Sequence, residues 1–419
     1  MTRRAGVGAA AVALCVVAGG APGLSQSQSR TKGPAIDGSP AWFLQGSFPD
    51  PGGRTIVESG GRVTIPARNA VIPGGAGARG AAPPPTPACR NSPLCGNRLG
   101  PGRQTLQRVQ WEQTLGYTFT YPYTLPPGFG GVPAVALDSK GNLWVFQRAP
   151  IGKPQLFKFD PNYTLMLEVG PDVIGYQDKA HGMAIDADDN VWITAANGAT
   201  VTKVSPDGKL LLTIGERGRR GDWNEARGQR LLWQPLMVAV APNGGVYIGE
   251  GHGNESPNDT DSNDPANNIG AARIIHVDKN GGFINQWYGN QVGQGKFSSV
   301  HGLAIDPRNG DVWIGDREEY RIVVYTADGR FLKTMQMRNL VCALLFDSRG
   351  DPWMASGQDG QFLKLDRSGK VVGAIGNGMG IGHGQFIEAS YWAMDRDDNL
   401  YAGDTSVGRV TKMVAPTRN

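Results

Sequence analysis

The chain has 419 residues, and its 41 lysines and arginines stand against 37 aspartates and glutamates, so the net charge is only +4. A charge this small argues against nucleic acid as a partner, because the phosphate backbone is bound through concentrated positive charge. The 61 glycines are roughly twice the ordinary share and predict many tight turns between short strands. With 40% hydrophobic and 19% charged residues, the chain is expected to fold around a core, and the composition excludes helical bundles and coiled coils.

The first 25 residues have the pattern of a secretory signal peptide. Arg3 and Arg4 precede an apolar run of small residues that extends from Ala5 to about Ala18 and is too short to span a membrane. Cleavage is expected near Ser25, which predicts a secreted or periplasmic protein without a membrane span. Residues 26–107 are rich in Gly, Pro, Ala and Arg, and this composition predicts an irregular arm.

Three cysteines would remain after this cleavage. Cys89 and Cys95 lie close together in a segment with loop composition, and export predicts a local disulfide between them. Cys342 lies in the apolar run "LVCALLFD", which predicts a buried thiol.

A repeated unit runs through residues 132–419. Each copy has an alternating apolar segment, a polar turn with Asp, Gly or Asn, and an aromatic residue within a second alternating segment, as in "VHGLAIDPRNGDVWIG" from Val300. The copies recur at intervals of about 40 to 66 residues, which is the range of propeller blades. The equivalent aromatic residues are Trp144, Trp192, Tyr247, Trp313, Trp353 and Tyr401.

The six units predict an all-β, six-bladed β-propeller over residues 108–419, expected to be a monomer. Each unit has room for four strands, the number that forms one blade. The sixth unit has only three strands before the chain ends, whereas the segment "RVQWEQTLG" at 108–116 resembles the fourth strands of other units. We therefore expect this N-terminal segment to complete the last blade and close the ring.

Two histidines occupy equivalent positions in the repeat. His181 and His301 each open the first strand of a unit, and first strands line the central channel of a propeller. Converging imidazoles are good ligands for zinc or a similar divalent ion. A gapless match of "GQGKFSSVH" with "GHGQFIEAS" places Ser390 where the sixth unit would supply a third histidine, and Glu388, Tyr391 or a water could fill this position. In the alternative interpretation, both imidazoles only pack and form hydrogen bonds at the channel mouth.

The units resemble NHL repeats, and "HGMAIDADDNVWIT" and "VHGLAIDPRNGDVWIGDREEYRI" are similar to blades of the peptidyl-α-hydroxyglycine α-amidating lyase family. The resemblance implies a six-bladed propeller in which three histidines on alternate blades hold zinc. It also implies that a tyrosine and arginines help to break a carbinolamine C–N bond, which releases an amide and glyoxylate. By position, it implies that His181 and His301 are metal ligands, with Ser390 in place of the third.

The same resemblance implies that Arg148 and Arg317 are the arginines, and it places His252 roughly where the catalytic tyrosine would be. All three residues follow the second strand of a unit, so we expect their side chains on one face of the propeller. Guanidinium groups suit a substrate carboxylate or a developing oxyanion, and an imidazole could carry the proton. In the alternative interpretation, Arg317 only pairs with a neighbouring Glu or Asp, Arg148 is a solvated loop residue, and His252 has a structural role.

These residues predict an exported, metal-dependent, lyase-like enzyme that acts on a small-molecule or peptide substrate with a carboxylate or amide. A calcium-dependent lactonase or esterase-like hydrolase and a non-catalytic binding module are the alternatives. The loop at 253–270 bears on the choice of metal, because closely spaced carboxylate and amide oxygens can hold calcium. The alternative is a solvated loop or one that covers the substrate. Its oxygen-bearing residues are Asp259, Asp261, Asn263 and Asp264.

Overall fold

The structure, a computed structural model of the whole chain, describes residues 57–59, 62–64, 113–251, 272–289, 295–337 and 340–417. The predicted signal peptide, the Cys89–Cys95 disulfide and most of the predicted arm lie outside these residues. Within the arm, β1 (Val57–Ser59) and β2 (Arg62–Thr64) form an antiparallel pair. No helix among the described residues is long and apolar enough to cross a membrane.

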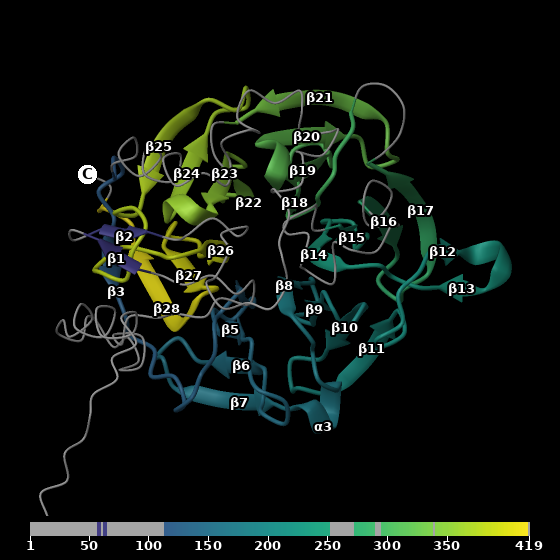
Figure 1. Cartoon of the computed structure of the whole chain (residues 1–419), viewed down its shortest axis with the longest axis horizontal. Helices are drawn as coiled ribbons and strands as arrows, with labels where there is room; N and C mark the ends of the chain where they lie inside the picture. Colours follow the sequence, from purple (N-terminus) through teal and green to yellow (C-terminus); the bar gives the residue numbers. More distant parts are fainter. Residues whose placement is uncertain are drawn as a thin grey trace, which may run out of the picture.

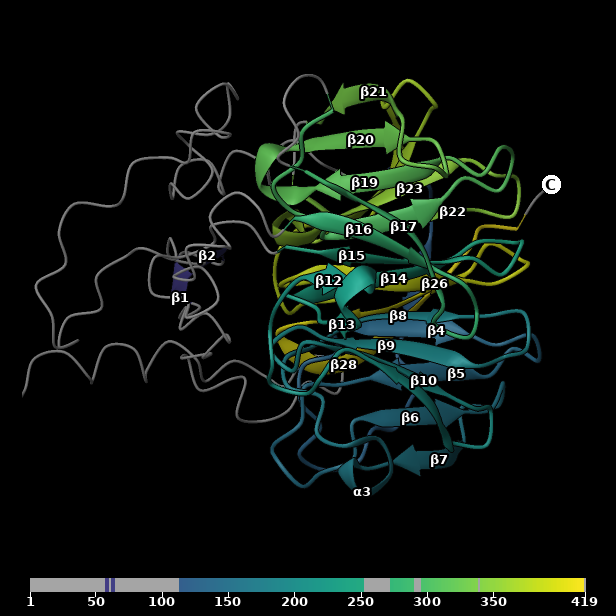
Figure 2. The ribbon, with the colours of Figure 1, turned by 90° about the vertical axis from the view of Figure 1, so that its right-hand side faces the viewer.

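The described residues form an all-β propeller, in which sheets are arranged around a common centre (Figure 1). Seen from the side, the strands of successive sheets cross the thickness of the ring (Figure 2). Four of the sheets contain four antiparallel strands each. Their strands are β8 (Ala180–Ile185), β9 (Val191–Ala195), β10 (Thr200–Val204), β11 (Leu210–Ile214), β14 (Pro235–Val240), β15 (Val246–Glu250), β16 (Arg273–Val277), β17 (Phe283–Tyr288), β18 (Gly302–Ile305), β19 (Val312–Asp316), β20 (Arg321–Tyr325), β21 (Phe331–Gln336), β22 (Val341–Phe346), β23 (Pro352–Ser356), β24 (Gln361–Leu365) and β25 (Val371–Ile375).

The remaining large sheet has eight strands in the order β3-β28-β27-β26-β4-β5-β6-β7. It consists of two antiparallel halves that are joined by one parallel pair, Tyr391 in β26 with Ala134 in β4. Its strands are β3 (Thr118–Thr120), β4 (Ala134–Leu137), β5 (Leu143–Phe146), β6 (Leu156–Phe159), β7 (Leu165–Val169), β26 (Ala389–Met394), β27 (Leu400–Asp404) and β28 (Val407–Val414). This sheet therefore joins the first and last repeat units, where separate four-stranded sheets were predicted.

The ring is closed by an N-terminal strand, but not by the segment predicted from the sequence. Strand β3 pairs antiparallel with β28, with Thr120 opposite Lys412. In the predicted segment 108–116, the described residues 113–116 are not a strand, and the N–H groups of Thr114 and Leu115 donate to the Ala374 carbonyl of the neighbouring sheet. Gly116 adopts a positive φ of 68°, which interrupts an extended run, whereas the β-branched and aromatic residues after it suit a pleated strand.

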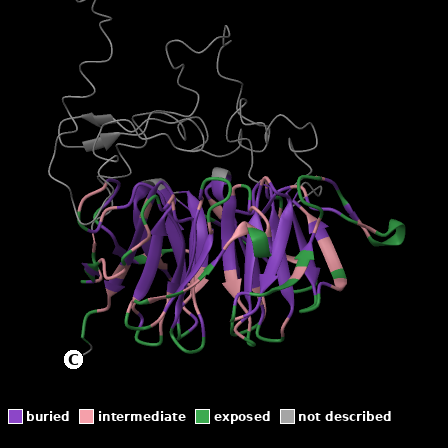
Figure 3. Ribbon diagram, turned by 90° about the horizontal axis from the view of Figure 1, so that it is seen from below, coloured by how far each residue is buried: buried purple, intermediate pink, exposed green. Residues whose placement is uncertain are grey.

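The short elements between sheets are few among the described residues. One α-helical turn, α3 (Pro171–Ile174), follows β7. A small hairpin follows β11 and consists of β12 (Trp223–Asn224), η4 (Glu225–Arg227) and β13 (Gln229–Arg230). The 3-10 turns η5 (Arg317–Glu319) and η6 (Gly357–Asp359) come directly after second strands. Strand interiors are buried, and exposure is concentrated in loops and outer strands (Figure 3).

The residues of the repeat motif form a buried polar cluster within the unit. In the second unit, Asp186 accepts hydrogen bonds from the indole of Trp192 at 3.1 Å and pairs with Lys203 at 3.0 Å. The Lys203 ammonium also lies over the Trp192 ring, 4.9 Å from its centre. Burial tends to raise the pKa of Asp186, but these donors outweigh it and hold the pKa below its ordinary value.

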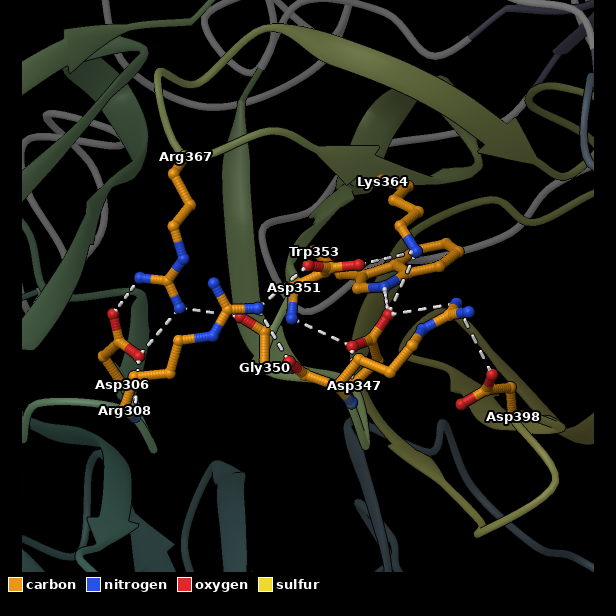
Figure 4. A network of polar contacts seen from close by, with 10 residues as sticks. Asp306, Arg308, Asp347, Gly350, Asp351, Trp353, Lys364, Arg367 and Asp398 are labelled. Atoms are coloured by element: carbon orange, nitrogen blue, oxygen red, sulfur yellow. Dashed lines mark hydrogen bonds and ion pairs between the residues drawn. The ribbon is translucent and has the colours of Figure 1, made fainter.

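Related ion pairs connect neighbouring sheets (Figure 4). Arg367, which follows β24, pairs with Asp306 after β18 and donates to the Gly350 carbonyl at 2.7 Å. Arg349 in turn lies 3.7 Å from Asp398, which precedes β27. These contacts link three successive repeat units of the ring.

Candidate functional site

The candidate site lies where the first strands of the units approach the centre of the ring (Figure 1). His181 is the second residue of β8, and His301 directly precedes β18. His181 is 2% exposed and His301 is 4% exposed. The equivalent repeat positions around the ring are Pro133, His181, Leu236, His301, Cys342 and Ser390.

Each imidazole is oriented by a backbone carbonyl of the following repeat unit. His181 Nδ1 lies 2.9 Å from the Leu236 oxygen, and His301 Nδ1 lies 2.7 Å from the Cys342 oxygen. A carbonyl oxygen only accepts hydrogen bonds, so Nδ1 carries the proton in each neutral ring and Nε2 keeps its lone pair. An N–H···O=C contact of this kind is the usual support of a metal-ligating histidine.

The two rings are close enough to act on one ion or one substrate group. Their centres are 4.8 Å apart, at an interplanar angle of 69°. Two imidazoles that share a tetrahedral zinc ion, with Zn–N bonds of about 2.0–2.1 Å, have centres about 5 Å apart. The two imidazoles that the sequence predicted to converge therefore lie side by side, with their ring centres 4.8 Å apart.

The third position differs from the pair. Ser390 is 4% exposed, and the described residues contain no group of three or more His, Cys, Asp or Glu side chains that could hold a metal. The Tyr391 ring lies 5.9 Å from the His301 ring and 5.4 Å from the His181 ring. Its hydroxyl donates to the His301 carbonyl, so Tyr391 packs against both imidazoles and is hydrogen-bonded on the backbone side of His301.

Thr194 is a supporting residue that the sequence did not reveal. Its hydroxyl donates to the Leu236 carbonyl at 2.9 Å and accepts from the Gly182 N–H at 2.7 Å. Thr194 thus fixes the same carbonyl that orients His181. A threonine within an alternating strand does not by itself indicate a partner for its hydroxyl, and only the tertiary structure shows which carbonyl the hydroxyl contacts.

Arg148 lies beside His181, on the loop after β5. Its Nε donates to the carbonyl of Ala180 at 3.0 Å, and its side chain is half-buried. The structure therefore brings Arg148 to the strand start that carries His181, as the shared loop position predicted.

Arg317 begins η5 and is 2% exposed. Its guanidinium Nη2 lies 3.2 Å from Oε1 of Glu388, a residue just before β26. The expected alternative was a pair with a sequence neighbour, whereas Glu388 comes from another unit of the ring. A buried guanidinium at this site is thus already engaged by a carboxylate.

A buried acid–arginine pair fixes the segment that leads to His301. Asp316 accepts from the N–H groups of Ser298 and Ser299, both at 3.0 Å, and pairs with Arg321 at 2.7 Å. Burial raises the pKa of the Asp316 carboxyl, although Arg321 and these N–H groups counteract the rise. The segment before β18 is therefore held by hydrogen bonds rather than by packing alone.

Asp404 plays the equivalent part in the sixth unit. It accepts from the N–H of Ile387 at 2.7 Å and from that of Glu388 at 3.3 Å, and Arg409 lies 3.7 Å away. Burial raises the pKa of Asp404 too, with Arg409 opposing it. As a result, the backbone that presents Glu388, Ser390 and Tyr391 is anchored.

Two further predictions have different outcomes. His252 and the acidic loop at 253–270 lie outside the described residues, so the predicted proton-transfer and calcium roles stay predictions.

Cys342 is 1% exposed, which confirms the predicted buried thiol, and its carbonyl is the one that orients His301.

The described residues thus form an all-β propeller with a pair of imidazoles near its centre. No family model matches the chain. It is 28% identical to the peptidyl-glycine alpha-amidating monooxygenase of Mus musculus over 306 residues, which is 62% of this chain and 29% of that protein. It is 24% identical to peptidyl-alpha-hydroxyglycine alpha-amidating lyase 1 of Drosophila melanogaster over 295 residues, 62% of this chain and 50% of that one.

The chain therefore spans half or less of the length of these two relatives. They confirm the resemblance to amidating lyases that the motifs indicated. A solved structure described as a proposed gluconolactonase superposes with a TM-score of 0.50 at 12% identity, covering 73% of this chain and 94% of that one. At this identity the likeness concerns the propeller fold alone.

Proposed function

We propose that this chain is an exported, metal-dependent lyase with a six-bladed propeller fold, acting on a small carboxylate- or amide-bearing substrate at the channel mouth. The count of six treats the two antiparallel halves of the eight-stranded sheet as separate blades, since a single residue pair joins them. The observation that carries the proposal is the buried pair His181 and His301, with both Nδ1 atoms on carbonyls and a ring separation of 4.8 Å.

The Nε2 atoms of His181 and His301 would hold the ion, for which zinc is the best match because it favours neutral imidazoles in a tetrahedral site. A bound zinc ion would supply Lewis-acid polarisation of a substrate oxygen. Ser390 stands at the third position, where water or a substrate group would complete the site. Calcium prefers oxygen ligands, and the sequence offers a candidate for them in the loop at 253–270.

The reaction that fits this arrangement is cleavage of a carbinolamine. The substrate hydroxyl loses its proton as its C–O bond becomes a carbonyl, and the C–N bond breaks with its electron pair going to nitrogen. Nitrogen then takes up a proton and leaves as an amide. Arg148 and Arg317 would orient the carboxylate side of the substrate, and His252 would carry the proton between oxygen and nitrogen.

A non-catalytic binding module is the second candidate, and the observation that favours it is Ser390 at the third ligand position. Metal content and turnover distinguish the two. We expect the mature protein, purified without a metal-binding tag, to contain about one zinc ion per chain. It should also release glyoxylate from N-benzoyl-α-hydroxyglycine.

His301→Ala should lose both zinc and turnover, whereas His383→Ala, which removes an exposed histidine, should keep both. Retention of zinc and turnover in His301→Ala would contradict the proposed site. A wild-type protein that neither contains nor binds zinc, and that releases no glyoxylate, would favour the binding module.

A further inference from the structure

The third repeat unit lies between the two units that carry the histidines, and the end of its second strand, β15, contacts the support of each (Figure 1). Gly251 directly follows β15. Its N–H donates to the Gln234 carbonyl at 3.2 Å, and its own carbonyl accepts the Val300 N–H at 3.0 Å. Gln234 belongs to the segment that leads to the carbonyl partner of His181, and Val300 directly precedes His301. One residue thus joins the supports of both imidazoles.

The backbone at this junction suits glycine and no larger residue. Gly251 has a φ of 97°, in the region that residues with a side chain rarely adopt. A Cβ atom there would lie 2.7 Å from the Cα of Ala272, at the start of the next strand. The junction is therefore closely packed, and its two hydrogen bonds have a fixed geometry.

A buried ion pair holds the chain next to this junction. The side chains of Glu250 and Arg273 are both 0% exposed, and Arg273 Nε donates to the Glu250 carboxylate. Glu250 also accepts the Trp233 N–H at 2.7 Å. Arg273 Nη2 donates to the carbonyls of Gly221 at 3.2 Å and Leu231 at 2.9 Å. The pair therefore fixes the chain just before β14, and it is costly to break because either partner alone would be an uncompensated buried charge.

We infer that Glu250 and Arg273 are the positioning pair of the histidine site, which set His181 and His301 relative to one another. One route runs from the pair through the start of β14 to the Leu236 carbonyl, 2.9 Å from His181 Nδ1. The other runs through the residue after Glu250, whose carbonyl accepts the N–H just before His301. The inference rests on the function proposed above, because it treats these two imidazoles as the working groups.

The Nδ1–H groups of the two imidazoles report their placement without metal or turnover. The chain has only five histidines, so NMR of the untagged, metal-free protein with isotope-labelled histidine gives few imidazole signals. His181→Gln and His301→Gln assign them. In the wild type we expect a slowly exchanging Nδ1–H signal from each, because each faces a carbonyl in a buried site. Absence of these signals would overturn the inference.

The variant Glu250→Met/Arg273→Met removes both charges together. It leaves no unpaired buried charge and should keep the fold, as circular dichroism would show. We expect exchange of the His181 Nδ1–H to be at least about tenfold faster than in the wild type. The rise should be smaller at His301, because Asp316 also holds the segment before that residue. Zinc affinity should fall by about 10–100-fold, as for other residues that support a metal-ligating histidine.

Asp138→Asn/Lys158→Met is the matched control. It also removes both charges of a largely buried pair, 3.2 Å apart with side chains 1% and 11% exposed. Asp138 directly follows the last residue of β4, whereas the histidines lie at the starts of first strands, so this pair belongs to the opposite end of the sheet. The control should leave both exchange rates unchanged, and equal acceleration in the control would overturn the inference.

The remaining outcomes also decide the matter. Unchanged exchange at either histidine in Glu250→Met/Arg273→Met would overturn the shared placement. If that variant does not fold, Arg273→Lys replaces it, because lysine keeps the charge beside Glu250 and lacks the guanidinium fork that reaches two carbonyls. Arg273→Lys should accelerate exchange at His181, and an unchanged rate would overturn the inference.

The positioning role and the lyase can fail separately. Faster exchange in the variants of the pair, in a protein that neither binds zinc nor releases glyoxylate, would support the inference and contradict the lyase. Zinc-dependent turnover with unchanged exchange would do the reverse.

Discussion

Replacing Thr194 with valine tests whether the carbonyl that orients His181 is itself held in place. Valine has nearly the shape of threonine but lacks the hydroxyl, so the change removes two hydrogen bonds and little packing. The Leu236 carbonyl would keep the His181 Nδ1–H at 2.9 Å and lose the Thr194 donor at 2.9 Å. The Gly182 N–H, now 2.7 Å from the hydroxyl, would lose its acceptor inside the ring.

The expected size follows from these two losses. Thr194 is 0% exposed, and a buried N–H left without an acceptor costs about 1–3 kcal/mol of the free energy of unfolding. Loss of a residue that supports a metal-ligating histidine typically lowers metal affinity by about 10–100-fold, which corresponds to roughly 1.4–2.7 kcal/mol. Thr194→Val should therefore be less stable and, if the pair holds zinc, bind it more weakly.

The free energy of unfolding is measured by urea denaturation of the metal-free protein, and zinc affinity by competition with a chromophoric chelator. Thr194→Ser is the matched control, because it keeps the hydroxyl and should retain most of the zinc affinity. Unchanged stability and zinc affinity in Thr194→Val would refute the reasoning, as would equal losses of zinc affinity in the valine and serine variants.

Two more predictions concern the third ligand position and acid stability. Ser390→His should raise zinc affinity by at least about tenfold. The Pro133 carbonyl, which accepts the Tyr391 N–H at 3.1 Å, has a second lone pair that would orient the new imidazole. Ser390→Ala should not raise zinc affinity, and equal zinc affinities in the wild type and Ser390→His would contradict this placement. Asp347 is buried, which tends to raise its pKa, but hydrogen bonds from the Asp351 N–H, Trp353 and Lys364 hold the pKa below its ordinary value. Its stabilisation is therefore present above the unfolded-state pKa of about 3.9 and is lost as the pH falls through the lower folded-state pKa. Asp347→Asn should reduce the free energy of unfolding by roughly 1–3 kcal/mol at pH 7, with a difference that shrinks in acid, and a difference independent of pH in urea denaturation would count against this account.

The central histidine pair illustrates how far a repeated sequence can predict a site. His181 and His301 hold the same place in their units, and units around a ring place equivalent residues at equivalent distances from the axis. Convergence of the two imidazoles could therefore be inferred from the sequence alone. Their carbonyl partners, Leu236 and Cys342, could not, because they depend on how one unit packs against the next.

The arginines show the same division. The position of Arg148 and Arg317 after second strands predicted that both side chains lie on the face of the histidine pair. The structure gives their partners, the Ala180 carbonyl for Arg148 and Glu388 for Arg317. The alternative to substrate contact for Arg317 was a pair with a sequence neighbour, whereas Glu388, with which it pairs, lies 71 residues away along the chain. Local propensity carries no information about a contact of this kind, since it arises only when the ring closes.

The all-β propeller and the identity of the central residues could be predicted without the structure, because alternation of apolar residues, turn chemistry and the repeat period are properties of neighbouring residues. The tertiary structure decided which N-terminal strand closes the ring, that Glu388 engages Arg317, and that Tyr391 and Thr194 support the imidazoles. Each of these contacts joins residues from different units or strands. Their energy is gained only when the separate sheets pack together, so packing and burial, rather than local sequence, select the partner.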